Sequence, residues 1–68
     1  MPFLNLKVAG TLSDEQKQAL TERFTTALEE IAGKPAAATY VVFDEMTRNN
    51  WAKSGELLSI TDQHSNKG

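Results

Sequence analysis

A strand is indicated by the stretch Phe3-Leu4-Asn5-Leu6-Lys7-Val8-Ala9, near the start of this 68-residue chain. Its residues alternate with the period of two that places successive side chains on opposite faces of a strand. One face then carries Leu4, Leu6 and Val8, and the other carries Phe3, Asn5 and Lys7. Gly10 and Thr11 interrupt the alternation, so the first strand is expected over residues 3–9.

A helix is expected directly after this strand. Ser13 followed by Gln16 is a capping-box pattern, and Asp14 and Glu15 place negative charge where the helix dipole favours it. Apolar residues then recur at helical spacing and predict one buried stripe, made of Leu20, Phe24, Ala27, Leu28 and Ile31. Gly33 is well placed just past the helix end, and Pro35 prevents the helix from resuming.

The second half of the chain predicts a second strand and a small C-terminal structure. Residues 39–43 are β-branched and aromatic, which favours a strand buried on both faces. Polar and turn-forming residues surround the lone Trp51 between residues 47 and 56, and a short apolar run follows at 57–60, so a loop or small hairpin is expected. Residues 62–68 lack apolar partners and are expected to form a mobile tail, or an arm that orders on a neighbouring subunit.

These elements predict an α/β fold with one domain over residues 1–68. A strand, a helix and a strand with these connections form a right-handed βαβ unit with parallel strands. One helix covers only one face of a two-stranded sheet, which leaves the other face and both edges open. We therefore expect dimers that join two units into a four-stranded sheet, and a closed symmetric assembly of such dimers.

The composition excludes several classes of function. A chain of this size buries only about 60% of its unfolded surface, and this one has no cysteine for disulfides and a single histidine, too few for a zinc site. A net charge of −2 without a basic stripe argues against nucleic-acid binding. No apolar run approaches the roughly 20 residues that span a bilayer, and no secretory signal is visible. We expect a cytoplasmic protein with neither a nucleic-acid nor a membrane partner.

Pro2 carries the first sign of chemistry. Removal of Met1 would leave a secondary amine on a ring whose φ is nearly fixed. An α-amino pKa is ordinarily about 7.7 to 8.0, and an apolar pocket lowers it because desolvation disfavours the charged form. Such an amine could act as a base at neutral pH. The alternative is that Pro2 only begins a strand at a position where no N–H is needed.

Several features together resemble the 4-oxalocrotonate tautomerase family over residues 2 to about 60. They are the N-terminal proline, the βαβ pattern, Ser13-Asp14-Glu15-Gln16-Lys17 at the helix start, Asp44-Glu45-Met46 at the end of the second strand, and an aromatic residue before Gly55-Glu56. The resemblance implies a homohexamer built as a trimer of dimers, without a metal or an organic cofactor. It also implies that Pro2 transfers a proton between atoms of a small enol or 2-oxo acid, in reactions such as those of aromatic compound catabolism.

Two positions depart from the family pattern. Its tautomerases carry one arginine just before the helix-capping serine and another early in the second strand, and these arginines bind substrate carboxylates. Leu12 and Tyr40 stand there in this chain. Because the fixed fork of donors is lost with each arginine, dicarboxylates such as 2-hydroxymuconate should bind poorly, and a monocarboxylate is expected. Ala9 and Lys53 stand where dehalogenase-type subunits use an arginine and a carboxylate, so a dehalogenase is not expected.

The remaining candidates each have a structural alternative. Trp51 matches the family aromatic that forms the hydrophobic wall behind the proline, but it could instead fill a subunit interface. Tyr40 could donate its O–H to a substrate oxygen or pack in the core. Lys53 and Arg48 flank Trp51 and could replace the missing arginines, although both, like Lys7, could be solvated surface charges. Asp44 and Glu45 are strand neighbours that point to opposite faces, so they are not expected to act as an acid pair.

Three functions are compatible with these residues. The first is an isomerase in which the Pro2 amine is the general base, Pro2 is the catalytic residue, and Tyr40, Trp51, Leu12, Lys53 and Arg48 bind substrate. The second is a non-catalytic or partner-dependent subunit of a hetero-oligomer, which the two missing arginines favour. The third is a small ligand-binding scaffold whose proline is never exposed as an amine.

Overall fold

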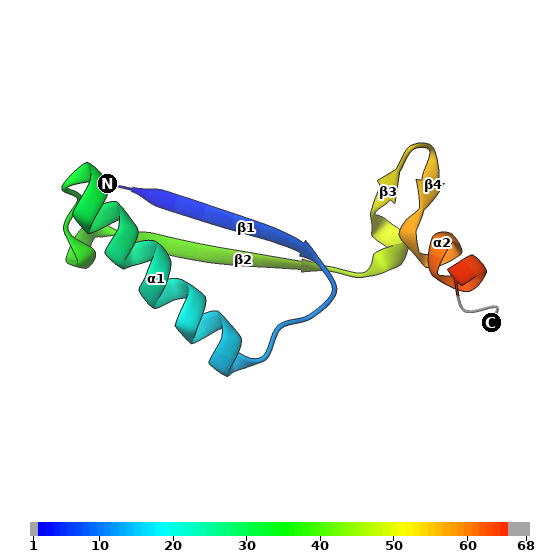
Figure 1. The fold of residues 1–68 in the computed structure, drawn as a ribbon, viewed down its shortest axis with the longest axis horizontal. Helices are drawn as coiled ribbons and strands as arrows, with labels where there is room; N and C mark the ends of the chain where they lie inside the picture. The colour runs from blue at the N-terminus through cyan, green and yellow to red at the C-terminus, as the bar shows by residue number, and fades with distance from the viewer. Residues whose placement is uncertain (1, 66–68) are drawn as a thin grey trace.

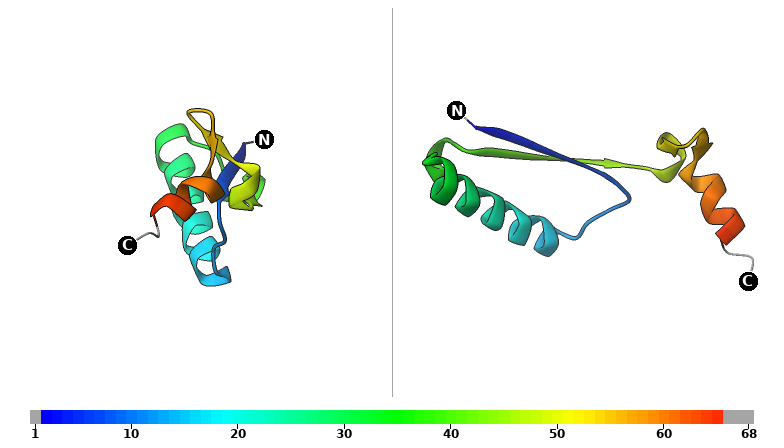
Figure 2. Two further views of the ribbon diagram at one scale, coloured as in Figure 1. Left: turned by 90° about the vertical axis from the view of Figure 1, so that its right-hand side faces the viewer. Right: turned by 45° about the horizontal axis from the view of Figure 1, so that its top comes forward.

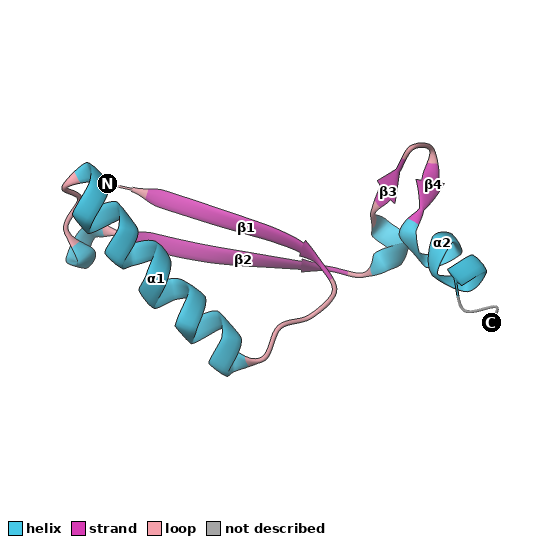
Figure 3. Ribbon diagram, viewed as in Figure 1, coloured by secondary structure: helices cyan, strands magenta, loops and turns pink. Residues whose placement is uncertain are grey.

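The computed structural model describes residues 2–65, and the side chains of residues 2–64 (Figure 1). Strand β1 (Phe3–Ala9), helix α1 (Asp14–Ala32) and strand β2 (Tyr40–Met46) form the larger part, with a 3₁₀ turn η1 (Ala36–Ala38) before β2. A C-terminal module follows β2 (Figure 3). It contains the 3₁₀ turn η2 (Arg48–Asn50), the strands β3 (Ala52–Lys53) and β4 (Glu56–Leu57), and helix α2 (Leu58–Ser65).

Strands β1 and β2 pair in parallel, which confirms the predicted βαβ unit. The register runs from Phe3 opposite Tyr40 to Ala9 opposite Met46. The ladder extends by one bond at each end: the Tyr40 N–H donates to the Pro2 carbonyl at 3.0 Å, and the Gly10 N–H donates to the Met46 carbonyl at 2.8 Å. Since β2 reaches Met46, the strand expected from residues 39–43 continues through Asp44-Glu45-Met46.

Both ends of α1 follow from local sequence signals. The Ser13 hydroxyl accepts from the Gln16 N–H at 3.1 Å, and the Gln16 side chain accepts from the Ser13 N–H at 2.9 Å. This reciprocal pair satisfies two N–H groups that a helix start otherwise leaves without partners. At the other end Gly33 adopts a left-handed φ of 66° and donates to the Glu29 carbonyl. The capping box and the glycine C-cap are confirmed.

Helix α1 packs on one face of the sheet through a narrower stripe than its sequence predicts. Its half-buried residues are Lys17, Leu20, Thr21, Phe24, Thr25 and Leu28. The prediction that Ala27 and Ile31 belong to this stripe is wrong for the single chain, because Ala27 is exposed and Ile31 is 85% exposed. A sheet of two strands is too narrow to cover the whole apolar side of the helix.

Among residues 2–65, no helix covers the other face of the sheet (Figure 2). Phe3, Tyr40 and Val42 are 64%, 55% and 39% exposed there, so the prediction that the second strand is buried on both faces is wrong for a single chain. None of the described side chains is fully buried. The radius of gyration is 16.0 Å, against about 11 Å for a compact domain of this length. The described part of a single chain therefore lacks the core expected of a stable domain.

The C-terminal module projects beyond the carboxyl ends of β1 and β2 (Figure 1). Strands β3 and β4 are antiparallel, which confirms the expected hairpin. Residues 62–65, expected to belong to a mobile tail or to an arm that orders on a neighbouring subunit, continue helix α2, where Asp62 is paired with Arg48. Residues 66–68 lie outside the described residues. Neither α1 nor the described part of α2 is long and apolar enough to cross a membrane.

Candidate functional site

Pro2 is held at the open end of the parallel ladder. It is half-buried, and its carbonyl accepts the Tyr40 N–H at 3.0 Å. Because a proline in a peptide chain has no N–H to donate, a sheet terminus accommodates it without an unpaired donor. The expected removal of Met1 concerns a residue outside the described part of the chain. The ladder thus fixes the Pro2 carbonyl and with it the position of the ring.

Tyr40 lies beside Pro2 and opposite Phe3 in the register. Its side chain is on the face that α1 leaves open, and the residue is 55% exposed. Since exposed aromatic surface is costly in water, Phe3 and Tyr40 together form an apolar region that a second protein surface could cover. In the single chain Tyr40 is therefore available to a substrate or to a neighbouring subunit, and it is not a core residue.

Leu12 lies at the opposite end of the sheet, in the turn from β1 to α1. Its N–H donates to Glu45 Oε2 at 2.7 Å, and Glu45 Oε1 accepts from Lys17 Nζ at 2.7 Å. These bonds place a carboxylate of β2 between the turn and the first part of the helix. Leu12 also lines a shallow groove of about 310 Å³ along α1, together with Gln16, Ala19, Leu20 and Arg23.

The charge of Glu45 is balanced locally. The hydrogen bond from Lys17, followed by that from the Leu12 N–H, lowers the pKa of the Glu45 carboxyl, because both bonds favour its ionised form. The same carboxylate raises the pKa of Lys17. Asp44 points to the other face, where Asn5 and Lys7 donate to it at 3.0 and 2.9 Å. The prediction that the side chains of Asp44 and Glu45 point to opposite faces is confirmed by these separate partners.

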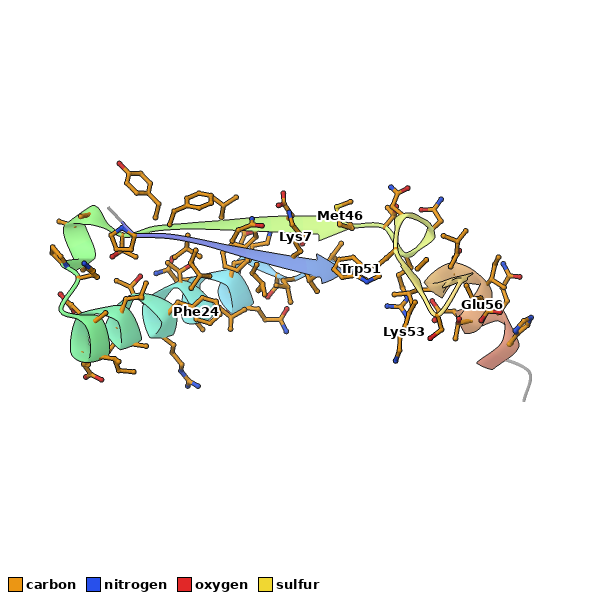
Figure 4. The ribbon with its side chains drawn as sticks, turned by 90° about the horizontal axis from the view of Figure 1, so that it is seen from above. Lys7, Phe24, Met46, Trp51, Lys53 and Glu56 are labelled. Atoms are coloured by element: carbon orange, nitrogen blue, oxygen red, sulfur yellow. The ribbon has the colours of Figure 1, made fainter. Side chains whose placement is uncertain are left out.

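Trp51 lies where the C-terminal module meets the sheet (Figure 4). It is half-buried and caps the carboxyl end of η2, and its carbonyl accepts the Leu58 N–H at 2.8 Å. Its chain neighbours are therefore anchored on both sides, by η2 before it and by the first residue of α2 after it. This placement suits an indole that forms a fixed wall.

Arg48 and Lys53, the two candidate cations, have different surroundings. Arg48 donates through Nε and Nη2 to the two carboxylate oxygens of Asp62, at 2.5 and 3.0 Å, and through Nη1 to the Ala9 carbonyl at 3.2 Å. Asp62 raises the pKa of Arg48, and Arg48 lowers the pKa of Asp62. Lys53 is exposed in the hairpin and lines a second groove of about 420 Å³ with Ser54, Glu56, Leu58 and Thr61.

The candidate residues fall into two groups at opposite ends of the sheet. Pro2 and Tyr40 form the first group, and the second consists of Leu12, Arg48, Trp51 and Lys53. The length of β1 lies between them, about 23 Å for seven residues at ~3.3 Å each. The described part of one chain therefore does not bring the two groups together. It also contains no cluster of three or more histidine, aspartate or glutamate side chains that could hold a metal ion.

Two residues beside the site escape prediction from the sequence. Glu45 holds Leu12, but its position on the strand says only that it faces away from Asp44. Asp62 holds Arg48, although the polar composition of residues 62–68 favours a tail. Asp62 follows Leu58 by four residues, and residues i and i+4 share one face of a helix. This spacing was the sequence signal that could have predicted a helix through Asp62.

Comparisons with known proteins agree with this architecture. A family model described as "Tautomerase enzyme" matches residues 2–60. The chain is 37% identical over 59 residues to a probable tautomerase of Bacillus cereus, covering 87% of this chain and 97% of that protein. It is 34% identical over 59 residues to a 2-hydroxymuconate tautomerase of Bacillus subtilis, covering 87% and 95%. The crystal structure of DmpI from Helicobacter pylori superposes with a TM-score of 0.84 at 31% identity, covering 91% of this chain and 97% of that one. With its parallel βαβ unit and this match over nearly its whole length, the chain belongs to the tautomerase family.

Proposed function

We propose that the protein is a tautomerase in which the amine of Pro2, exposed by removal of Met1, is the general base for keto–enol proton transfer. The substrates are small enol or 2-oxo acids with one carboxylate. The position of Pro2 carries this proposal, because its carbonyl is bonded into the ladder beside Tyr40 and the ring cannot swing away. A base held in one position pays little entropy to reach the proton it removes.

The proton transfer needs no group beyond the amine and the substrate. The neutral amine takes a proton from the carbon next to the carbonyl, the C–H electron pair forms the C=C bond, and the carbonyl oxygen becomes an enolate. The protonated amine then returns the proton to that oxygen, and the reverse sequence converts enol to ketone. Hydrogen-bond donors near the enolate lower the barrier. The Tyr40 hydroxyl is the nearest candidate by position, and Lys53 of another copy is the second.

We propose that the site is completed by self-association. Pro2 and Tyr40 lie at one end of the sheet, and Leu12, Trp51 and Lys53 lie at the other, so a second copy in the opposite direction would bring unlike ends together. Exposed Phe3, Tyr40 and the absence of a buried core among the described residues support such an interface. The resemblance implies a homohexamer. A cytoplasmic location and a role in aromatic compound catabolism stay predictions.

We infer a preference for monocarboxylates from Leu12 and Tyr40. An apolar and an aromatic side chain replace two guanidinium groups, so a second carboxylate would lose its water without gaining a charged partner. Relatives include proteins named 2-hydroxymuconate tautomerase, which act on a dicarboxylate. This chain should favour an enol acid with an apolar group in place of the second carboxylate.

Ketonisation kinetics test this proposal directly. The purified protein is first checked by intact mass for loss of Met1, and ketonisation of phenylenolpyruvate and of 2-hydroxymuconate is then followed for the wild type and for Pro2→Ala. We expect turnover that depends on Pro2 and a larger kcat/KM for phenylenolpyruvate. Equal rates for the wild type and Pro2→Ala would refute proline catalysis.

One alternative function is favoured by the same missing arginines. The chain could be a partner-dependent subunit that contributes Trp51 and other pocket walls to an active neighbour. The two functions differ in what the protein does alone. A complete homohexamer that turns over phenylenolpyruvate excludes the partner-dependent subunit, whereas a correctly processed hexamer without activity on either substrate supports it.

A further inference from the structure

The side chain of Arg48 ties together three segments of the chain. Its guanidinium contacts both carboxylate oxygens of Asp62 in α2 and the carbonyl of Ala9 at the end of β1, while its own backbone begins η2. The paired bonds to one carboxylate use the fork geometry that is specific to arginine. A single side chain therefore links the end of the sheet to both ends of the C-terminal module.

One partner in this link, Asp62, lies just past the residues that the family model matches. That model covers residues 2–60. Asp62 follows that region, in the second half of α2. The link therefore joins the end of the βαβ unit to the second half of α2.

Trp51 lies inside the loop that this link closes. The chain runs from Arg48 through Trp51 and the hairpin to α2, and the Arg48–Asp62 pair joins the two ends of that path. The Leu58 N–H bond to the Trp51 carbonyl closes a smaller loop within it. Figure 4 shows Trp51 next to the tip of β1, the strand whose last carbonyl Arg48 holds. Opening the pair would free the module that carries the indole to move relative to the sheet.

We propose that Arg48 and Asp62 form a latch that fixes Trp51 against the carboxyl end of the sheet. Arg48 is then a positioning residue, and its contact with α2 sets the position of the aromatic wall. The role of the latch in catalysis rests on the proposed function, whereas its role in holding Trp51 does not depend on that function. This assignment replaces the expectation that Arg48 binds substrate, because its guanidinium charge is already neutralised by Asp62 and three of its N–H groups are engaged.

The two roles of Arg48 predict opposite effects of changing Asp62. If Arg48 bound the substrate carboxylate, Asp62→Asn would release a competing anion, and KM for phenylenolpyruvate would fall. If the pair is a latch, Asp62→Asn and Arg48→Lys both loosen Trp51 and impair turnover similarly. Because the two residues act through one contact, the double variant should then be no worse than either single variant.

The experiment uses the fluorescence of Trp51, the only tryptophan in the chain. The full-length protein is compared with Asp62→Asn, Arg48→Lys and the charge exchange Arg48→Asp with Asp62→Arg, and exposed Gln63→Ala is the matched control on α2. We expect about a twofold rise in acrylamide quenching and red-shifted emission for the two single variants, as for a locally opened segment. The charge exchange should restore part of the protection, and Gln63→Ala should match the wild type.

Fluorescence and kinetics separate the possible failures. Unchanged quenching in both single variants, or a lower KM in Asp62→Asn, would overturn the latch. If the single variants are quenched more strongly and the wild type turns over neither enol acid, the latch is supported and the proposed function is not. Circular dichroism and the oligomeric state are measured for every variant, and Asp62→Glu, which keeps the charge, replaces any variant that does not fold. If Trp51 in Asp62→Glu stays partly protected from acrylamide, the result would support the latch. A complete loss of this protection in Asp62→Glu would contradict it.

Discussion

Restoring the two missing guanidinium groups should change which substrate the protein prefers. The changes are Leu12→Arg and Tyr40→Arg, singly and together. Both positions tolerate a longer polar side chain, because Leu12 is only half-buried and Tyr40 is 55% exposed. We expect the double variant to gain activity on 2-hydroxymuconate and to lose activity on phenylenolpyruvate, because the change removes the Tyr40 hydroxyl and the apolar Leu12 side chain from the proposed site.

The size of the gain follows from the surroundings of each position. A hydrogen bond to a charged group contributes about 1.5 to 3 kcal/mol. At Leu12 the backbone is already fixed by the 2.7 Å bond from its N–H to Glu45, so less entropy is lost on binding. At exposed Tyr40 solvent weakens the pair, and we take the lower end of the range. Together the two changes should contribute about 3 kcal/mol, which is roughly a hundredfold in kcat/KM.

The Glu45 carboxylate is the main competitor for an arginine at position 12. Lys17 already occupies one of its oxygens at 2.7 Å, which leaves the new guanidinium free to meet the substrate. Leu12→Lys is the matched control, since it adds the same charge without the fork and should gain much less. Steady-state ketonisation of both substrates by all variants gives the comparison. A double variant that shows no gain on 2-hydroxymuconate, or that gains equally on both substrates, would refute the assignment of Leu12 and Tyr40 to the carboxylate site.

Three further predictions concern stability. Ser13→Ala removes the hydroxyl that accepts the Gln16 N–H and should lower the stability by about 1 kcal/mol, or roughly 4–8 °C in Tm. The Tm is compared at one protein concentration because unfolding and dissociation are coupled. An unchanged Tm would contradict the capping role. Gly33→Ala places a β-carbon at a φ of 66° where no atom lies within 4 Å, so only backbone strain of about 1 kcal/mol should appear in denaturant unfolding, and a larger loss would mean that the site is crowded. Lys17 lowers the pKa of Glu45, and this stabilisation is complete above the unfolded-state value of about 4 and lost as the pH falls through the lower folded-state value. The Tm difference between the wild type and Glu45→Gln should therefore be largest near neutral pH and should disappear at a pH of about 3. A difference that stays constant with pH would exclude a role of the charge.

The elements of the βαβ unit could be predicted from the sequence because their signals are local. The alternation of residues 3–9, the capping pair Ser13 and Gln16, and the left-handed Gly33 all act through atoms a few residues apart. Such contacts involve only residues that are near one another in the chain, so the sequence displays them directly. The position of Pro2 after Met1 already suggested an amine base, and the resemblance to the 4-oxalocrotonate tautomerase family, which the comparisons confirm, favoured that interpretation over a purely structural proline.

The arrangement of the candidate site depended on contacts between distant residues. Leu12 and Glu45 are 33 positions apart, and Arg48 and Asp62 are 14 apart, so neither pair has a periodicity that a sequence displays. The buried stripe of α1 was predicted too wide, since Ala27 and Ile31 are exposed in the single chain. The spacing of apolar residues along a helix does not say how wide the sheet beneath it is. By itself the sequence determined the strands, the helix with its caps, and the residue types available for chemistry. Tertiary structure alone decided that Asp62 and the Ala9 carbonyl meet at Arg48 and that Glu45 holds Leu12, because these contacts join residues far apart in the chain.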